Sequence, residues 1–143
     1  MAARHAGDSM DLGQAVMVAG IGCRADVSVT DVEAAIAAAL RQAVSPGKPL
    51  SVIATPAAKG HEAGISAAAA ARGIPLVLIA QQDLEAAGAR TITRSARAMA
   101  VMKVHSVAEA AALAGAGPAG RLLGPRVAVG PVTCALAEVA PIP

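Results

Sequence analysis

The sequence lacks all three aromatic residue types: its 143 residues include no phenylalanine, tyrosine or tryptophan. It therefore has no aromatic surface on which nucleobases could stack and no aromatic cage for a cationic ligand. Any core must be filled by valine, isoleucine, leucine, methionine and alanine. The length suffices for one domain and is too short for two ordinary domains. We expect a disordered lead-in at residues 1–13 and a single domain at residues 14–143.

Cysteine and histidine are also scarce, and neither is spaced to hold a metal. Cys23 and Cys134 lie far apart, outside any CxxC or Cys/His ligand pattern. The three histidines do not share one helical face; they are His5, His61 and His105. We expect two reduced, buried thiols in a cytoplasmic protein that holds no metal and no cofactor.

The sequence has no long run of one charge and no long apolar run. Its formal net charge is +2 without a basic tract, which argues against a nucleic-acid partner. No stretch reaches the roughly 18 apolar residues that a membrane span needs, so we expect no membrane partner. Charged residues interrupt positions 1–14, which therefore do not resemble a secretory signal.

What the sequence does contain is an alternation of short apolar runs and alanine-rich helical patterns. Thr30 and Glu33 form a capping-box pattern for the first helix, and Gly73 marks the end of the second. Residues 89–103 show no clear preference. Strands are expected at 15–19, 50–54 and 76–80, with two or three short strands in 121–138; helices are expected from about residue 30, at 62–72, 81–87 and 107–114. The alternation predicts a three-layer α/β/α fold with a mixed, mostly parallel sheet and a C-terminal antiparallel hairpin.

Gly20 and Gly22 follow the first apolar run and precede the first helix. Glycines at such a point favour a tight turn whose N–H groups can face an anion. A turn that serves folding alone is an equally good interpretation. A dinucleotide-binding loop is disfavoured, because Ala25 stands where the third glycine would be and no acidic residue clearly follows the second strand.

Lys59 and Glu62 lie three residues apart, just after the second expected strand. A lysine and a carboxylate there could act as general acid and base on a bound substrate. The residues alone favour a simpler interpretation, in which Glu62 complements the positive start of its helix and Lys59 faces solvent. Ser106 and Glu109 form a second capping-box pattern, for which a structural role is also favoured.

Several basic residues occur where loops or element ends are expected, namely Arg24, Lys59, Arg94, Arg97, Arg121 and Arg126. If they converge, they would suit an acidic small molecule; the alternative is a set of scattered, solvated charges.

Taken in order, the motifs resemble the family of CobE proteins and CbiG C-terminal domains. The similarity runs from about residue 15 to 138 and rests on residues 18–24 (VAGIGCR), 55–64 (T-x-x-x-K-x-x-E-x-G), 73–76 (GIPL), 82–84 (QDL), 106–113 (SVAEAAAL), Arg126 and 133–137 (TCALA). The sequence departs from the family pattern at Lys103, where relatives often have glycine, and at Arg126, where they often have lysine.

This resemblance implies a role in cobalamin (vitamin B12) biosynthesis on a corrin-ring (precorrin) intermediate. The short chain resembles the stand-alone CobE type of the aerobic route, which implies a corrinoid-binding or carrier protein. CbiG-type relatives open a ring-A lactone, which leaves an enzyme with Lys59 and Glu62 as catalytic residues as an alternative. An accessory subunit of another pathway enzyme is a third. The expected substrate-binding residues are Gly20, Gly22, Cys23, Arg24, Thr55, Lys59, Ser106, Val107, Glu109 and Arg126.

Overall fold

The first apolar run forms a strand that is longer than the sequence predicts. In the computed structural model, which describes residues 16–43 and 49–139, strand β1 (Val16–Cys23) extends through both glycines of the Gly20-x-Gly22 motif. Along its whole length it pairs with the C-terminal strand β6 (Val132–Val139). Its side chains are buried on both faces, as expected for a strand at the centre of an α/β sheet.

The strands form one mixed sheet in the order β3-β2-β1-β6-β4, with β5 also paired to β6. β1, β2 and β3 are mutually parallel, and β6 runs antiparallel to β1, β4 and β5. Among the described strands, β6 alone has the opposite direction, so the expected mostly parallel sheet with a C-terminal antiparallel hairpin is confirmed. The remaining strands are β2 (Val52–Pro56), β3 (Leu76–Ile79), β4 (Arg121–Leu122) and β5 (Val127–Val129).

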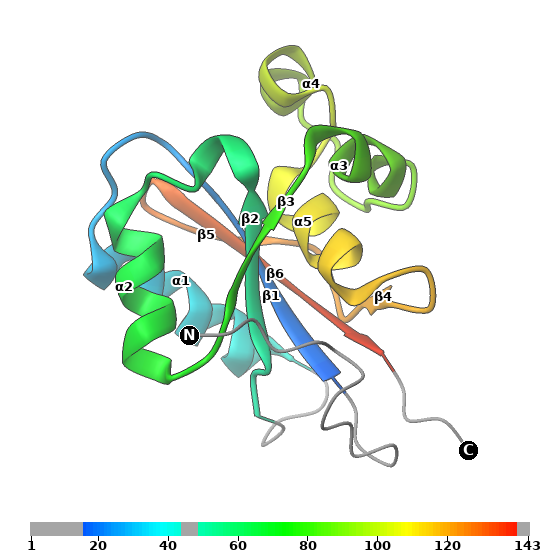
Figure 1. The fold of residues 1–143 in the computed structure, drawn as a ribbon. Coiled ribbons are helices and arrows are strands. Elements are labelled where there is room, and N and C mark those ends of the chain that lie inside the picture. Colours follow the sequence, from blue (N-terminus) through cyan, green and yellow to red (C-terminus); the bar gives the residue numbers. More distant parts are fainter. Residues whose placement is uncertain (1–15, 44–48, 140–143) are drawn as a thin grey trace.

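Helices cover both faces of this sheet, which confirms the three-layer architecture (Figure 1). One face carries α1 and α2 and the other carries α3 and α5, while α4 stands apart at one end of the molecule. The helices are α1 (Val29–Gln42), α2 (Ala63–Arg72), α3 (Gln81–Gly88), α4 (Ala96–Met102) and α5 (Val107–Ala116), with a short 3-10 turn η1 (Ala57–Lys59) after β2. None of the helices in the described ranges has the length and hydrophobicity of a membrane span.

The two faces of the sheet are packed with side chains of different size. Under α1 and α2 the core consists of branched and long aliphatic side chains such as Met17, Ile36 and Ile65. Under α5 it consists largely of alanines, including Ala108 and Ala112. Small side chains let helix and sheet approach closely, so dense packing is reached without aromatic rings.

Gly20 is required by this close approach and does not form a turn. A Cβ atom at Gly20 would lie 2.1 Å from the carbonyl oxygen of Ala108 and 2.4 Å from the nitrogen of Ala112. The expected tight turn at Gly20 and Gly22 is therefore wrong: both residues are extended strand, because α5 packs directly on β1. The chain turns only later, at Asp26, which has a φ of 60°.

The helix ends correct one capping prediction and confirm two others. α1 begins at Val29, where the Ser28 hydroxyl accepts a hydrogen bond from the Asp31 N–H at 3.0 Å, so Thr30 is not its cap. The carboxylate of Glu33 instead pairs with Arg72 on the neighbouring α2 at 2.9 Å. Gly73 ends α2 in the left-handed conformation, and Ser106 caps α5.

Candidate functional site

A cleft of about 500 Å3 opens at the carboxyl end of β1. The chain winds outward from β1 through β2 to β3, then continues on the other side of β1 with β6 and β4. In open α/β sheets, ligands bind at such a change of winding, outside the carboxyl ends of the strands. The cleft is lined by Gly22, Cys23, Arg24, Ala25, Lys59, Ser95, Arg97, Ala98, Val101, Met102, Val107, Arg126, Ala128, Gly130, Pro131 and Thr133.

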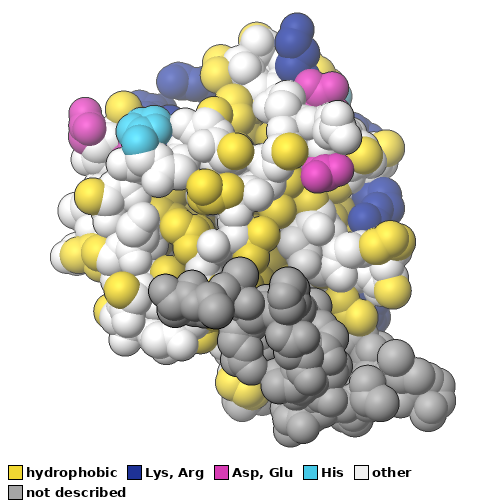
Figure 2. Space-filling model, viewed as in Figure 1, with side chains coloured by type: hydrophobic (Ala, Val, Ile, Leu, Met, Phe, Trp, Pro, Cys, Tyr) yellow, Lys and Arg dark blue, Asp and Glu magenta, His cyan; other side chains and the backbone are white. Residues whose placement is uncertain are grey.

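Four cationic side chains from four separate segments line this cleft: Arg24, Lys59, Arg97 and Arg126. Among the described residues, no aspartate or glutamate lines it. Figure 2 shows Lys and Arg side chains in dark blue at the upper end of the molecule, the end at which α4 stands in Figure 1. Like charges gathered in one cleft raise its positive potential and favour an anionic ligand. Of the six basic residues at expected loops and element ends, these four converge, whereas Arg94 and Arg121 do not line the cleft.

One wall of the cleft is apolar. Ala98, Val101 and Met102 lie on α4, and they face a surface to which Val107 contributes from the start of α5. Val101 is 68% exposed, so its aliphatic side chain is open to contact from the cleft. The cleft therefore combines separate cations with an exposed aliphatic surface.

Six of the ten residues that the sequence predicts to bind a substrate line the cleft. They are Gly22, Cys23, Arg24, Lys59, Val107 and Arg126. The glycine at position 22 keeps the floor open, because a Cβ there would lie 2.8 Å from Oγ1 of Thr133 and 3.3 Å from Cβ of Val107.

The other four predicted residues have structural contacts instead. Gly20 lies under α5, and the Thr55 hydroxyl donates a hydrogen bond to the Ile21 carbonyl at 2.9 Å. The Ser106 hydroxyl accepts from the N–H of Glu109 at 3.3 Å. Both Ser106 and Glu109 are fully buried and lie behind the cleft wall.

Glu62, one of the two expected catalytic residues, does not line the cleft. Its side chain is buried, and its two carboxylate oxygens accept hydrogen bonds from the N–H groups of Asp26 (3.1 Å) and Val27 (3.2 Å). The hydrogen bond from Asp26, together with that from Val27, holds the pKa of Glu62 below its usual value. The geometry favours a role in which Glu62 fixes the loop that carries Arg24, and of the expected pair Lys59 alone lines the cleft.

Glu109 has an analogous position on the other side of the cleft. Oε1 accepts from the N–H groups of Ile92 (2.6 Å) and Thr93 (2.9 Å), and Oε2 accepts from the Arg126 N–H (2.9 Å) and the Thr93 hydroxyl. Burial by itself raises the pKa of this carboxyl, but the hydrogen bonds from Thr93, Arg126 and Ile92 together outweigh burial and lower it. Glu109 is therefore ionised at neutral pH, with both oxygens occupied.

Cys23 is the one thiol in the cleft wall. Partial burial raises its pKa, and this effect exceeds the opposing influence of Lys59. The thiol is thus protonated at neutral pH and a poor nucleophile. Within residues 16–43 and 49–139, no three His, Cys, Asp or Glu side chains come together as a metal site.

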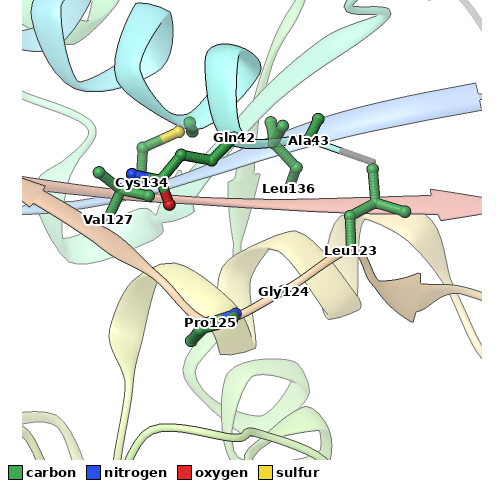
Figure 3. A pocket seen from close by; sticks show the side chains of 9 residues that line it. Gln42, Ala43, Leu123, Gly124, Pro125, Val127, Cys134 and Leu136 are labelled. Atoms are coloured by element: carbon green, nitrogen blue, oxygen red, sulfur yellow. The ribbon is translucent and has the colours of Figure 1, made fainter. Parts of the chain in front are cut away.

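A second, smaller pocket lies on the opposite side of the sheet from α5. Figure 3 shows Gln42 and Ala43 from the end of α1 facing the segment Leu123-Gly124-Pro125. It holds about 140 Å3 and includes Cys134, whose pKa burial raises to about 12. Among the described residues, no ionised side chain lines it, so the cationic cleft is the better candidate for a functional site.

The part of the cleft that α4 forms is not predicted from the sequence, because residues 89–103 show no clear pattern. Helix α4 is too short to display an apolar period. One signal was present: Ser95 precedes a run of good helix formers, and its hydroxyl accepts a hydrogen bond from the Ala98 N–H at 3.1 Å.

Comparison with known proteins identifies the family of the chain. Residues 17–137 match the family described as cobalamin synthesis G C-terminus. The chain belongs to this family. It is similar to the crystal structure of CobE, a protein from the cobalamin biosynthetic pathway, with 30% identity over 96% of this chain and 100% of that one and a TM-score of 0.82.

It is also similar to the cobalamin biosynthesis protein chiG from Agrobacterium tumefaciens str. C58. The identity is 38% over 87% of this chain and 98% of that chain, with a TM-score of 0.67. No curated protein matches the sequence. The chain is therefore a cobalamin biosynthesis protein of the CobE and CbiG C-terminal type, and the resemblance seen in its motifs is confirmed.

Proposed function

We propose that this protein binds and carries a corrin-ring intermediate of cobalamin biosynthesis in its cationic cleft. The observation that carries the proposal is the convergence of Arg24, Lys59, Arg97 and Arg126 around one cleft. Corrin precursors have peripheral side chains that end in carboxylates. Guanidinium groups pair with carboxylates through two parallel hydrogen bonds, which gives both affinity and orientation.

The apolar wall supports the same ligand. A corrin has broad, largely apolar faces, and Ala98, Val101 and Met102 offer an aliphatic surface beside the cations. The cleft volume of about 500 Å3 is within the usual range for small-molecule sites. It fits one edge of a corrin, whose remaining side chains would stay in solvent.

A carrier explains the site better than an enzyme does. An acid–base pair requires two groups within reach of the substrate. Glu62 does not line the cleft, because its carboxylate accepts hydrogen bonds from the N–H groups of Asp26 and Val27. Lys59 is left as a binding cation. A carrier needs only to hold and release the pigment, and the four cations beside an aliphatic wall support that role.

Binding can be measured from the visible spectrum of the pigment. Because the chain has no aromatic residues, its own absorbance near 280 nm is almost nil. The protein would be mixed with cobyrinic acid, a corrin with free peripheral carboxylates, and separated from free pigment by gel filtration. Cobinamide, whose peripheral groups are amides, is the matched control ligand. We expect co-elution of cobyrinic acid at micromolar concentration and much weaker retention of cobinamide.

Variants assign the binding to this cleft. Arg24→Ala or Arg126→Ala should each weaken cobyrinic acid binding about tenfold, the effect of losing one hydrogen bond between charged groups. Arg94→Ala is the control, because Arg94 is exposed and does not line the cleft. No retention of either corrin, or equal loss in all three variants, would contradict the proposal.

The same experiment separates the two alternative functions. A bound spectrum that changes with time, and stops changing in Lys59→Ala, would indicate an enzyme of the lactone-opening kind. Recovery of another pathway enzyme in a pull-down, without pigment binding, would indicate an accessory subunit.

A further inference from the structure

The cleft has two halves that are built differently. Arg24 directly follows β1, and Lys59 ends the turn η1 that follows β2. Arg97 lies on α4, and Arg126 lies in the segment between β4 and β5; these two form the outer half of the cleft. α4 contains no buried residue; Met102, at its C-terminal end, packs against the core and accepts a hydrogen bond from Gln81 at its carbonyl oxygen. Arg97 lies near the other end of α4, so its position depends on the segment that leads into the helix.

Hydrogen bonds to Glu109 fix the position of this segment. Its carboxylate bonds to Ile92 and Thr93, which lead into α4, and to the backbone of Arg126 itself. One buried carboxylate therefore joins the two segments that carry Arg97 and Arg126. We propose that Glu109 is the positioning residue of the outer half of the cleft and that its charge sets the affinity for carboxylates there; the affinity part of this inference rests on the proposed function.

The chemistry of the four hydrogen bonds makes the proposal specific. All four partners of Glu109 are donors, and only an ionised carboxylate can accept from all of them. In Glu109→Gln, an amide nitrogen that replaces Oε2 can still donate to the Thr93 hydroxyl. The same amide nitrogen cannot accept from the Arg126 N–H, so that hydrogen bond is lost. The substitution keeps the size of the side chain and removes mainly the bond that ties Arg126 to α5.

The proposal can be tested first without any ligand, by residue-specific amide hydrogen exchange. We expect the Arg126 N–H to exchange about tenfold or more faster in Glu109→Gln, while amides of the β1–β6 pairing keep their protection. Glu62→Gln is the matched control, since it also neutralises a buried carboxylate that binds backbone N–H groups. It should accelerate exchange at Asp26 and Val27 and leave Arg126 unchanged.

The second readout is affinity for the two corrins. Glu109→Gln should weaken cobyrinic acid binding about tenfold and reduce its dependence on salt, because fewer cations engage the ligand. Binding of cobinamide should not change. A merely structural defect would lower both affinities alike, so the contrast between the two ligands identifies positioning.

A milder variant keeps the test valid if Glu109→Gln does not fold. Thr93→Val removes one of the four donors and preserves shape; we expect it to speed exchange at Thr93 and to weaken cobyrinic acid about threefold. Faster exchange with unchanged affinity would overturn the positioning role, as would unchanged exchange at Arg126 in a folded Glu109→Gln protein. If wild-type protein binds neither corrin, the proposed function fails, and the exchange experiment still decides whether Glu109 anchors the two segments.

Discussion

Helices α4 and α5 follow each other in the sequence, yet one is mostly exposed and the other is mostly buried. Each begins with a serine cap, Ser95 for α4 and Ser106 for α5, and each consists mainly of good helix formers. None of the residues of α4 is buried, whereas six of the ten residues of α5 are. Local sequence explains why both are helices; it does not explain the difference in burial.

The difference lies in what each helix meets. α5 faces Gly20 in β1, where the missing side chain admits the helix backbone, and its own Gly115 lies against Val18 and Ala54. α4 packs against the core through the partly buried Met102 and otherwise lies at the edge of the cleft. We therefore expect α5 to contribute more than α4 to stability, and α4 to contribute to the proposed ligand binding. The following predictions test this division.

The largest expected effect comes from closing the space that α5 occupies. Gly20→Ala would place a Cβ within 2.1 Å of the Ala108 carbonyl oxygen, so α5 would have to move away from β1. We expect a loss of about 3 kcal/mol or more in the free energy of unfolding, measured by urea denaturation. Gly124→Ala is the control, because nothing lies within 4 Å of a Cβ there. Equal stability of the two variants would contradict the packing account.

The second largest effect is expected at acid pH, where protonation of Glu109 weakens its hydrogen bonds to the segment that leads into α4. The pKa of Glu109 is lower in the folded protein than its ordinary value of 4.5, so its ionised form stabilises the fold above that pH. That contribution is lost as pH falls below about 4.5 toward the lowered pKa, and the same holds for Glu62. Urea denaturation between pH 7 and pH 3 should show a fall confined to the acid range. Glu109→Gln should make the fall shallower and leave the part that Glu62 contributes, and an equally steep fall in that variant would exclude Glu109 as a cause.

Removing the two serine caps compares the helices directly. Ser106→Ala should cost about 1 kcal/mol in the free energy of unfolding, because α5 is part of the core. Ser95→Ala should cost less than about 0.5 kcal/mol globally, because fraying of an exposed helix leaves the core intact. It should nevertheless weaken cobyrinic acid binding, since Arg97 lies in the first turn of α4. Equal global costs would show that α4 contributes to the core.

The sequence predicts the parts of the molecule whose physical cause is local. The strand–helix alternation, the end of α2 at Gly73 and the cap at Ser106 are all encoded within a few residues. The sequence does not predict that Gly20 admits a helix, because that helix, α5, lies almost ninety residues later. The function of Glu62 and Glu109 escaped prediction for the same reason, since their partners belong to distant loops. The cations of the cleft were recognised as a set, but only the fold brings four of them together.

The smallest expected effect on stability, and the sharpest test of the comparison, is Val101→Ala in α4. Val101 is 68% exposed, so loss of two methyl groups should change the free energy of unfolding by less than about 0.5 kcal/mol. If the corrin covers this side chain, those methyl groups are buried only in the complex, and affinity should fall about fivefold. Ile92→Ala is the matched control, because Ile92 is 53% exposed and does not line the cleft. The measurement is titration of both variants with cobyrinic acid. A similar loss of affinity in each variant, or no loss of affinity in Val101→Ala, would mean that α4 is not a wall of the binding site.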